Sequence, residues 1–226
     1  MSLSATRTGL VALLLALSGL AWWSTVDRMQ GMMNTRDLGA VGWFVGVWIV
    51  MMAAMMFPSV APTVALYARM AGRRARSAPL VFAGGYLVTW AVPGLLAYGA
   101  WRAGHELLGD AGSWLVGGTL LLAAVYELTP LKNVCLSKCR SPFGFLVGAW
   151  RDGYRGAFTM GTRHGAWCVG CCWALMAALF ALGVMSIAWM ASVAVLIGAE
   201  KLLPWRRVAT YGVAIVLLVL GVVSLA

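Results

Sequence analysis

The sequence predicts an all-α fold, a polytopic transmembrane helical bundle in which residues 1–226 form a single membrane domain of about seven spans. Two observations lead to this prediction: 62% of the residues are hydrophobic and only 11% are charged, and long apolar runs alternate with short basic breaks. Soluble domains average about 25% charged residues, and a chain of this size cannot bury so much apolar surface in its own core. The lipid bilayer is therefore the surrounding that we expect.

Apolar runs of about 17–25 residues mark the individual spans. The predicted segments are Leu10–Trp23, Leu38–Tyr67, Pro79–Trp101, Ser113–Leu131, two spans within Gly165–Leu203, and Val208–Ala226. At about 1.5 Å per residue, Gly165–Leu203 is far too long for one span. We therefore divide it by a tight turn at Ala181–Ser186, which contains Gly183.

The first apolar run has a second interpretation as a cleaved signal peptide, because Arg7 precedes it and the small residues Gly19 and Ala21 lie near its end. However, Trp22 and Trp23 are typical of an aromatic anchor at a membrane interface, and no clean small-x-small cleavage site is present. We therefore favour an uncleaved helix, and six spans is the alternative.

The basic residues between the spans predict the orientation. With the N-terminus inside, all but three of the 17 lysines and arginines lie in inside segments, the exceptions being Arg28, Arg36 and Arg102. This asymmetry favours a cytoplasmic N-terminus and an outer C-terminus. It places residues 132–163, between spans four and five, in a cytoplasmic loop with short amphipathic helices such as Phe143–Trp150. The same distribution explains the net charge of +10 without nucleic acid.

All five cysteines and one of the two histidines lie within a short part of the chain. These residues are Cys135, Cys139, His164, Cys168, Cys171 and Cys172. On helices, the first two share a face at i,i+4, and the others share a stripe at i, i+4 and i+7 or i+8. Both groups lie at predicted cytoplasmic ends of spans, so they can converge on one ion.

Thiolates are soft ligands that suit Cu(I), Zn(II) or iron–sulfur clusters. A reducing cytoplasm keeps thiols free of disulfides. We therefore predict a metal site at these six residues, with Cu(I) preferred over Zn(II) and iron–sulfur clusters. The alternative is that the cysteines are small apolar residues that only pack in the core.

Four methionines, Met51, Met52, Met55 and Met56, form two adjacent stripes just before Pro58. Thioethers also bind Cu(I), so a relay from methionines within the membrane to thiols inside is one hypothesis. Methionine also fills gaps between helices well, and we prefer that interpretation for this cluster.

Glu127 lies in the fourth predicted span, just before Pro130, which should kink or end the helix. A carboxylate at membrane depth is costly and usually functional. Glu127 is a candidate metal ligand, a proton carrier, or an ion-pair partner of Lys132 or a neighbouring arginine, and these roles stay open. Glu200 and Lys201 end the sixth span and are predicted to anchor it at the interface.

Several stretches carry a family resemblance. They read MMAAMMFPS (Met51–Ser59), YELTPLKNVCLSKC (Tyr126–Cys139), CVGCCWALM (Cys168–Met176), GVMSIAWM (Gly183–Met190) and EKLLP (Glu200–Pro204). They resemble an uncharacterised bacterial family of predicted metal-binding integral membrane proteins. The resemblance implies a bacterial inner-membrane location and a site built from the five cysteines, with Glu127 and the methionines as further candidates.

The predicted function is to bind, deliver or transport a soft ion, with copper preferred, through the cysteine and histidine cluster. The expected partners are the bilayer and a metal-delivery or membrane protein, and a homo-oligomer and an enzymatic role stay open. One alternative is a membrane thiol-redox protein that uses the C-x-x-C pair Cys168 and Cys171, which the inside location disfavours. Another is a scaffold without metal.

Overall fold

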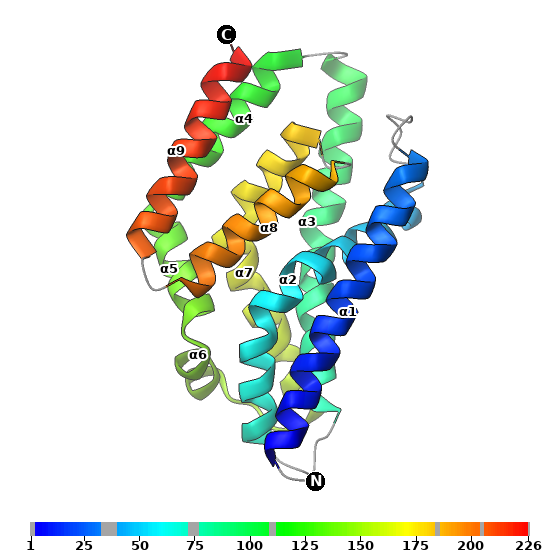
Figure 1. Cartoon of the computed structure of the whole chain (residues 1–226), viewed down its shortest axis with the longest axis vertical. Helices are drawn as coiled ribbons and strands as arrows, with labels where there is room; N and C mark the ends of the chain where they lie inside the picture. Colours follow the sequence, from blue (N-terminus) through cyan, green and yellow to red (C-terminus); the bar gives the residue numbers. More distant parts are fainter. Residues whose placement is uncertain are drawn as a thin grey trace.

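The computed structural model describes residues 3–32, 40–71, 77–108, 112–183, 186–203 and 206–225. These ranges fold into α-helices and contain no β-strand (Figure 1), so the all-α prediction is confirmed. The helices are α1 (Leu3–Met32), α2 (Val41–Ala71), α3 (Ala78–Leu108), α4 (Gly112–Glu127), α5 (Pro130–Arg140), α6 (Pro142–Ala149), α7 (Gly153–Gly183), α8 (Ile187–Leu202) and α9 (Arg206–Leu225). Leu38 and Ala226, and the loop residues Arg36, Arg73, Arg74 and Arg76, lie outside the described residues.

Five of the described helices are long and apolar enough to cross a membrane, and a sixth crossing is reached if α4 and α5 count as one bent span. The five segments are Thr8–Asp27, Val41–Ala71, Ala78–Ala100, Gly153–Gly183 and Arg207–Leu225. Helix α8, the predicted sixth span, has 16 residues. At about 1.5 Å per residue it is short for a hydrocarbon core of about 30 Å. The described helices thus supply five or six of the seven predicted crossings.

The predicted fourth span, Ser113–Leu131, is broken by a bend of 67°. Helix α4 ends at Glu127, and α5 begins at Pro130. The Thr129 side chain accepts a hydrogen bond from the backbone N–H of Lys132 and so caps α5. Pro130 occupies the first turn, where its missing N–H costs nothing. The bend lets α5, which carries two cysteines, pack against α7.

Helix α7 begins at Gly153, well inside the segment 132–163 that the sequence assigns to a loop. Gly161 and Gly165 form a pair of small residues four positions apart, which predicts close contact between helices, and the structure shows that contact. A Cβ on Gly161 would collide with the backbone carbonyl of Phe82 in α3, and one on Gly165 would press against Thr89 and the carbonyl of Tyr86. Small residues at such positions let two helix backbones approach each other. Residues 153–163 therefore form the first turns of the helix that holds the candidate site.

The break between α7 and α8 falls within the predicted turn, Ala181–Ser186. Gly183 ends α7 with a φ of +108°, which glycine adopts without strain from a Cβ. Ser186 then caps α8 by accepting a hydrogen bond from the backbone N–H of Trp189 at 3.5 Å. The chain reverses direction between Gly183 and Ser186, so that α8 packs alongside α7.

Pro58 lies inside α2 and leaves the carbonyl of Ala54, four residues earlier, without its helical donor. The hydroxyl of Ser18 in α1 donates to that carbonyl at 2.7 Å. Both side chains are buried. The hydrogen bond therefore satisfies a backbone group that the apolar interior cannot solvate, and it joins α1 to α2.

The contact between α3 and α7 gives a first prediction. Gly161→Ala should lower the thermal midpoint of the detergent-solubilised protein by several degrees, because the new methyl group meets the backbone of α3. Overpacking costs about 1–3 kcal/mol, and each kcal/mol lowers the midpoint of a chain of this size by about 2–4 °C. Gly84→Ala in α3 is the matched control, since its Cβ would have no neighbour within 4 Å. Equal midpoints for the two variants would show that the helices can move apart freely.

Candidate metal centre

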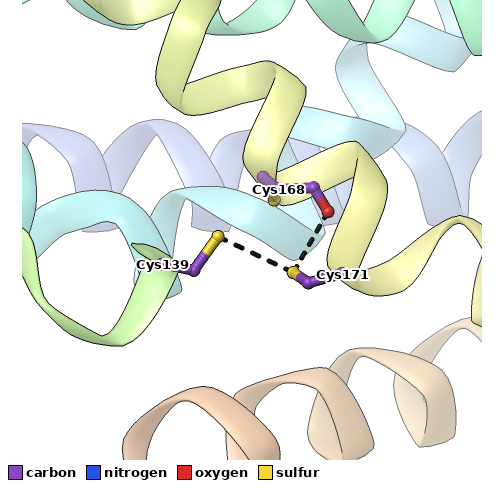
Figure 2. Close-up of side chains that lie close together, drawn as sticks. All are labelled: Cys139, Cys168 and Cys171. Carbon is purple, nitrogen blue, oxygen red and sulfur yellow. Dashed lines mark hydrogen bonds between the residues drawn. The ribbon is translucent and has the colours of Figure 1, made fainter. Parts of the chain in front are cut away.

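Three cysteines from two helices point toward one another (Figure 2). Cys139 comes from the last turn of α5, and Cys168 and Cys171 come from α7. Their Sγ atoms all lie within 4.8 Å of one another, and the Sγ atoms of Cys139 and Cys171 are 3.7 Å apart. Among the described histidine, cysteine, aspartate and glutamate residues, no other group of three or more brings its ligand atoms this close.

The donor set of this centre is three free thiols. Cys168 and Cys171 are buried, and Cys139 is half-buried. Sulfur donors select soft ions, and Cu(I) accepts low coordination numbers. Structural zinc sites usually have four ligands, so three thiols alone fit zinc less well. We refer to Cys139, Cys168 and Cys171 below as the three-sulfur centre.

The other two cysteines lie beside the three-sulfur centre. The Sγ of Cys172 donates to the backbone carbonyl of Cys168 at 2.9 Å. Cys135 packs against Gly170, where an added Cβ would lie 2.7 Å from its Sγ. The Tyr126 hydroxyl donates to the carbonyl of the same glycine at 2.5 Å. Both thiols are buried and belong to the surroundings of the centre, but not to the group of converging sulfurs.

Cys168 has two polar neighbours from distant parts of the chain. The Lys201 ammonium lies 3.0 Å from its Sγ, and the Tyr86 hydroxyl also lies 3.0 Å from it. A neighbouring ammonium and hydroxyl both stabilise negative charge on sulfur, which is the form that binds metal. The sequence predicts Lys201 as an interfacial anchor, whereas the structure directs it to the centre. The sequence feature that could have indicated this buried role is the charged pair Glu200 and Lys201 at the end of an apolar run.

A buried ion cluster lies next to the centre. The ammonium of Lys132 donates to both carboxylate oxygens of Glu200, at 2.7 and 2.8 Å, and also pairs with Glu127. All three side chains are buried. Of the roles considered for Glu127, the structure therefore shows the ion pair with Lys132. The prediction that Glu200 anchors the helix at an interface is wrong, because this carboxylate faces the interior.

His164 is buried in α7 and surrounded by aromatic rings. Its ring centroid lies 4.9 Å from that of Phe145, 6.0 Å from Phe82 and 6.1 Å from Tyr86. Its Nδ1 has no hydrogen-bond partner among the described residues. The imidazole thus lies one turn before Cys168 on α7, but outside the three-sulfur centre.

The four methionines of the predicted cluster, Met51, Met52, Met55 and Met56, are all buried in α2. Met56 has a described contact with the surroundings of the centre, because its Sδ lies 3.9 Å from the Nζ of Lys201. The cluster therefore belongs to the helix core, and at Met56 it reaches the lysine that contacts Cys168.

The ion cluster gives a second prediction. Lys132→Met should destabilise the protein strongly, by about 3–5 kcal/mol, because it leaves two buried carboxylates without a counter-charge. Lys138→Met on the same helix is the control, since Lys138 is exposed. Unfolding in detergent, followed by circular dichroism, measures both. If Lys132→Met were as stable as Lys138→Met, the carboxylates would have to be neutral in the folded protein.

Comparison with known proteins places the chain in a family. No curated protein and no solved structure matches it at a significant level. Residues 45–224 match the model of the PpoB2 family, which is described as a copper chaperone. The match runs from within α2 to the end of α9 and includes every residue of the three-sulfur centre. The resemblance to a metal-handling family is confirmed, and the chain belongs to the PpoB2 copper chaperone family.

Proposed function

We propose that this protein is an integral membrane copper chaperone that binds Cu(I) at Cys139, Cys168 and Cys171 and passes the ion to a partner protein. The observation that carries the proposal is the convergence of three thiols from two helices in a chain of a copper chaperone family. Three thiolates satisfy Cu(I), and before the ion binds the nearby ammonium of Lys201 stabilises the thiolate of Cys168.

A chaperone must release its ion as well as hold it. As a residue Cys139 is half-buried at the end of a helix, whereas Cys168 and Cys171 are buried, and all three are buried at their ligand atoms. An acceptor thiol can therefore approach from the side of Cys139, once the last turn of α5 moves aside, and replace the ligands one by one. This route assigns the partner surface to the end of α5.

The other residues that the sequence predicts as metal ligands remain proposed ligands. Cys135, Cys172 and His164 lie on the two helices of the centre, Glu127 pairs with Lys132 on one of them, and Met51, Met52, Met55 and Met56 lie buried in α2. The contacts described above favour the three-sulfur centre as the ion's resting position. For the other predicted ligands, the same contacts favour roles beside the three-sulfur centre.

The distribution of side chains supports a membrane location. Large apolar residues are exposed on the outside of the bundle, such as Leu122 at 71%, Val195 at 69% and Val208 at 68%. Charged residues such as Lys132 are buried inside. This is the arrangement that lipid favours, because lipid solvates apolar side chains but no charge. We propose the bacterial inner membrane as the location.

We also propose that the N-terminus is cytoplasmic and the C-terminus lies outside. The start of α1 and the end of α9 lie at opposite ends of the long axis (Figure 1), as an odd number of crossings requires. This proposal predicts that alkaline phosphatase fused after Ala226 is active in cells, because the enzyme folds only outside the cytoplasm. Fusions in the loop between α2 and α3 should be inactive. The reverse pattern would contradict the orientation.

The copper site predicts a defined stoichiometry. The protein purified in detergent without oxygen should hold about one Cu(I) per chain after loading and desalting, measured by elemental mass spectrometry. Cys139→Ser, Cys168→Ser and Cys171→Ser should each lower the affinity for Cu(I) by about tenfold or more in competition with a chelator.

Cys135→Ser and Cys172→Ser are the matched controls, because both thiols are buried near the centre but outside the converging group. They should keep the stoichiometry and most of the affinity. A parent protein that holds no copper would refute the proposed function. Equal losses in all five variants would instead assign the ion to a different set of sulfurs.

A thiol-redox function is the second candidate, favoured by the 3.7 Å between the Sγ atoms of Cys139 and Cys171. The sequence suggests Cys168 and Cys171 as the redox pair, whereas the structure gives Cys171 a closer partner in α5. A reversible disulfide, mapped by mass spectrometry after mild oxidation in a protein that binds no copper, would favour this candidate.

A further inference from the structure

The ammonium of Lys201 lies among unusual partners. Its Nζ is 3.0 Å from the Sγ of Cys168 in α7, 3.4 Å from the Oγ of Ser59 and 3.9 Å from the Sδ of Met56, both in α2. Lys201 itself lies in the last turn of α8 and is half-buried. Two helices thus direct two sulfur atoms and one hydroxyl at the positive charge that α8 carries.

Apart from the thiolate form of Cys168, which the ammonium stabilises, these partners suit an ammonium poorly. A thioether is a weak hydrogen-bond acceptor, and a buried ammonium is normally paired with a carboxylate. A carboxylate is available one residue away, but both oxygens of Glu200 are turned to Lys132. The charge of Lys201 is therefore left to a thiol sulfur and a thioether. Two such sulfurs are the donors that a soft cation prefers.

We propose that Cys168 and Met56 form a two-sulfur binding position for Cu(I), which the ammonium of Lys201 fills until the ion arrives. The inference rests on the proposed function, that the three-sulfur centre holds Cu(I), and it adds the step by which the ion reaches that centre. Cys168 belongs to both positions. The ion can therefore exchange Met56 for Cys139 and Cys171 without leaving the sulfur of Cys168.

The charge balance explains why the arriving ion is monovalent. Cu(I) and an ammonium each carry one positive charge, so with Cys168 a thiolate before and after, the exchange leaves the net charge next to the buried Glu127, Lys132 and Glu200 unchanged. A divalent ion would carry one charge more than the single thiolate of the two-sulfur position neutralises, and a buried unpaired charge is costly. Because Lys201 is half-buried and has a long side chain, its ammonium can move outward to a more polar position.

One test compares Met56→Leu with Met52→Leu. Both methionines are fully buried in the same helix, and Met56 is the one in contact with Lys201. Transfer of Cu(I) from a coloured chelator complex to the oxygen-free protein is followed by stopped-flow absorbance. Met56→Leu should slow the transfer by about tenfold or more while still reaching one Cu(I) per chain, and Met52→Leu should stay within about twofold of the parent. Equal rates for the two variants would overturn the inference.

A second test follows the lysine itself. The protein with and without Cu(I) is treated briefly with an amine-acetylating reagent, and each lysine is quantified by mass spectrometry. Acetylation of Lys201 should rise when Cu(I) is bound, because the ammonium has left Cys168. Exposed Lys138 and the ion-paired Lys132 serve as controls that should not change. Unchanged acetylation of Lys201 in the copper-loaded protein would overturn the inference.

The two proposals fail in different ways. A parent protein that binds no Cu(I) refutes the proposed function. A parent protein that binds Cu(I), with equal loading rates in the two methionine variants or constant acetylation of Lys201, refutes only the two-sulfur position. Elution volume and thermal midpoint of each variant, compared with those of the parent, show whether a rate change reflects misfolding.

Discussion

The ammonium of Lys132 joins three helices inside the bundle. It pairs with Glu127 at the end of α4 and Glu200 in α8, while Lys132 itself belongs to α5. A buried charge keeps its partners close, because losing one partner leaves an uncompensated charge in an apolar interior. One residue of the centre and one neighbour of it depend on this: Cys139 lies on α5, and Lys201, which contacts Cys168, follows Glu200 on α8. The ion cluster therefore holds two of the helices that meet α7 at Cys168.

Much of the candidate site could be predicted from spacing along single helices. The pairing of Cys168 with Cys171 follows from the helical period, and the break at Pro130 follows from the missing N–H of proline. That Cys139, and not Cys135, meets the α7 pair depends on the 67° bend, an angle that no local pattern encodes. Lys201 reaches Cys168 through tertiary packing. The local sequence at the end of α8 does not predict that packing.

The glycines of α7 show that a glycine-rich stretch can mark either a loop or a close contact between helices. A glycine-rich stretch with arginines is typical of a loop, and the sequence assigns residues 153–163 accordingly. In the structure, Gly161 and Gly165 face the backbone of α3, where no larger side chain fits. Their composition thus records a close contact between helices. The three-sulfur centre depends on it, because α3 also supplies Tyr86, which lies against Cys168.

The hydrogen bond from Ser18 to the carbonyl of Ala54 bears on the first helix, all of which precedes the part of the chain that matches the family model. A peptidase that removed this helix would withdraw the donor and leave a carbonyl without a partner inside α2, one residue before Met55 and two before Met56. Removal of the first helix would then affect the proposed entry of copper at Met56, because it would leave the nearby carbonyl oxygen of Ala54 unpaired. The first helix thus supplies, through Ser18, the hydrogen-bond donor that Pro58 withholds from its neighbour α2.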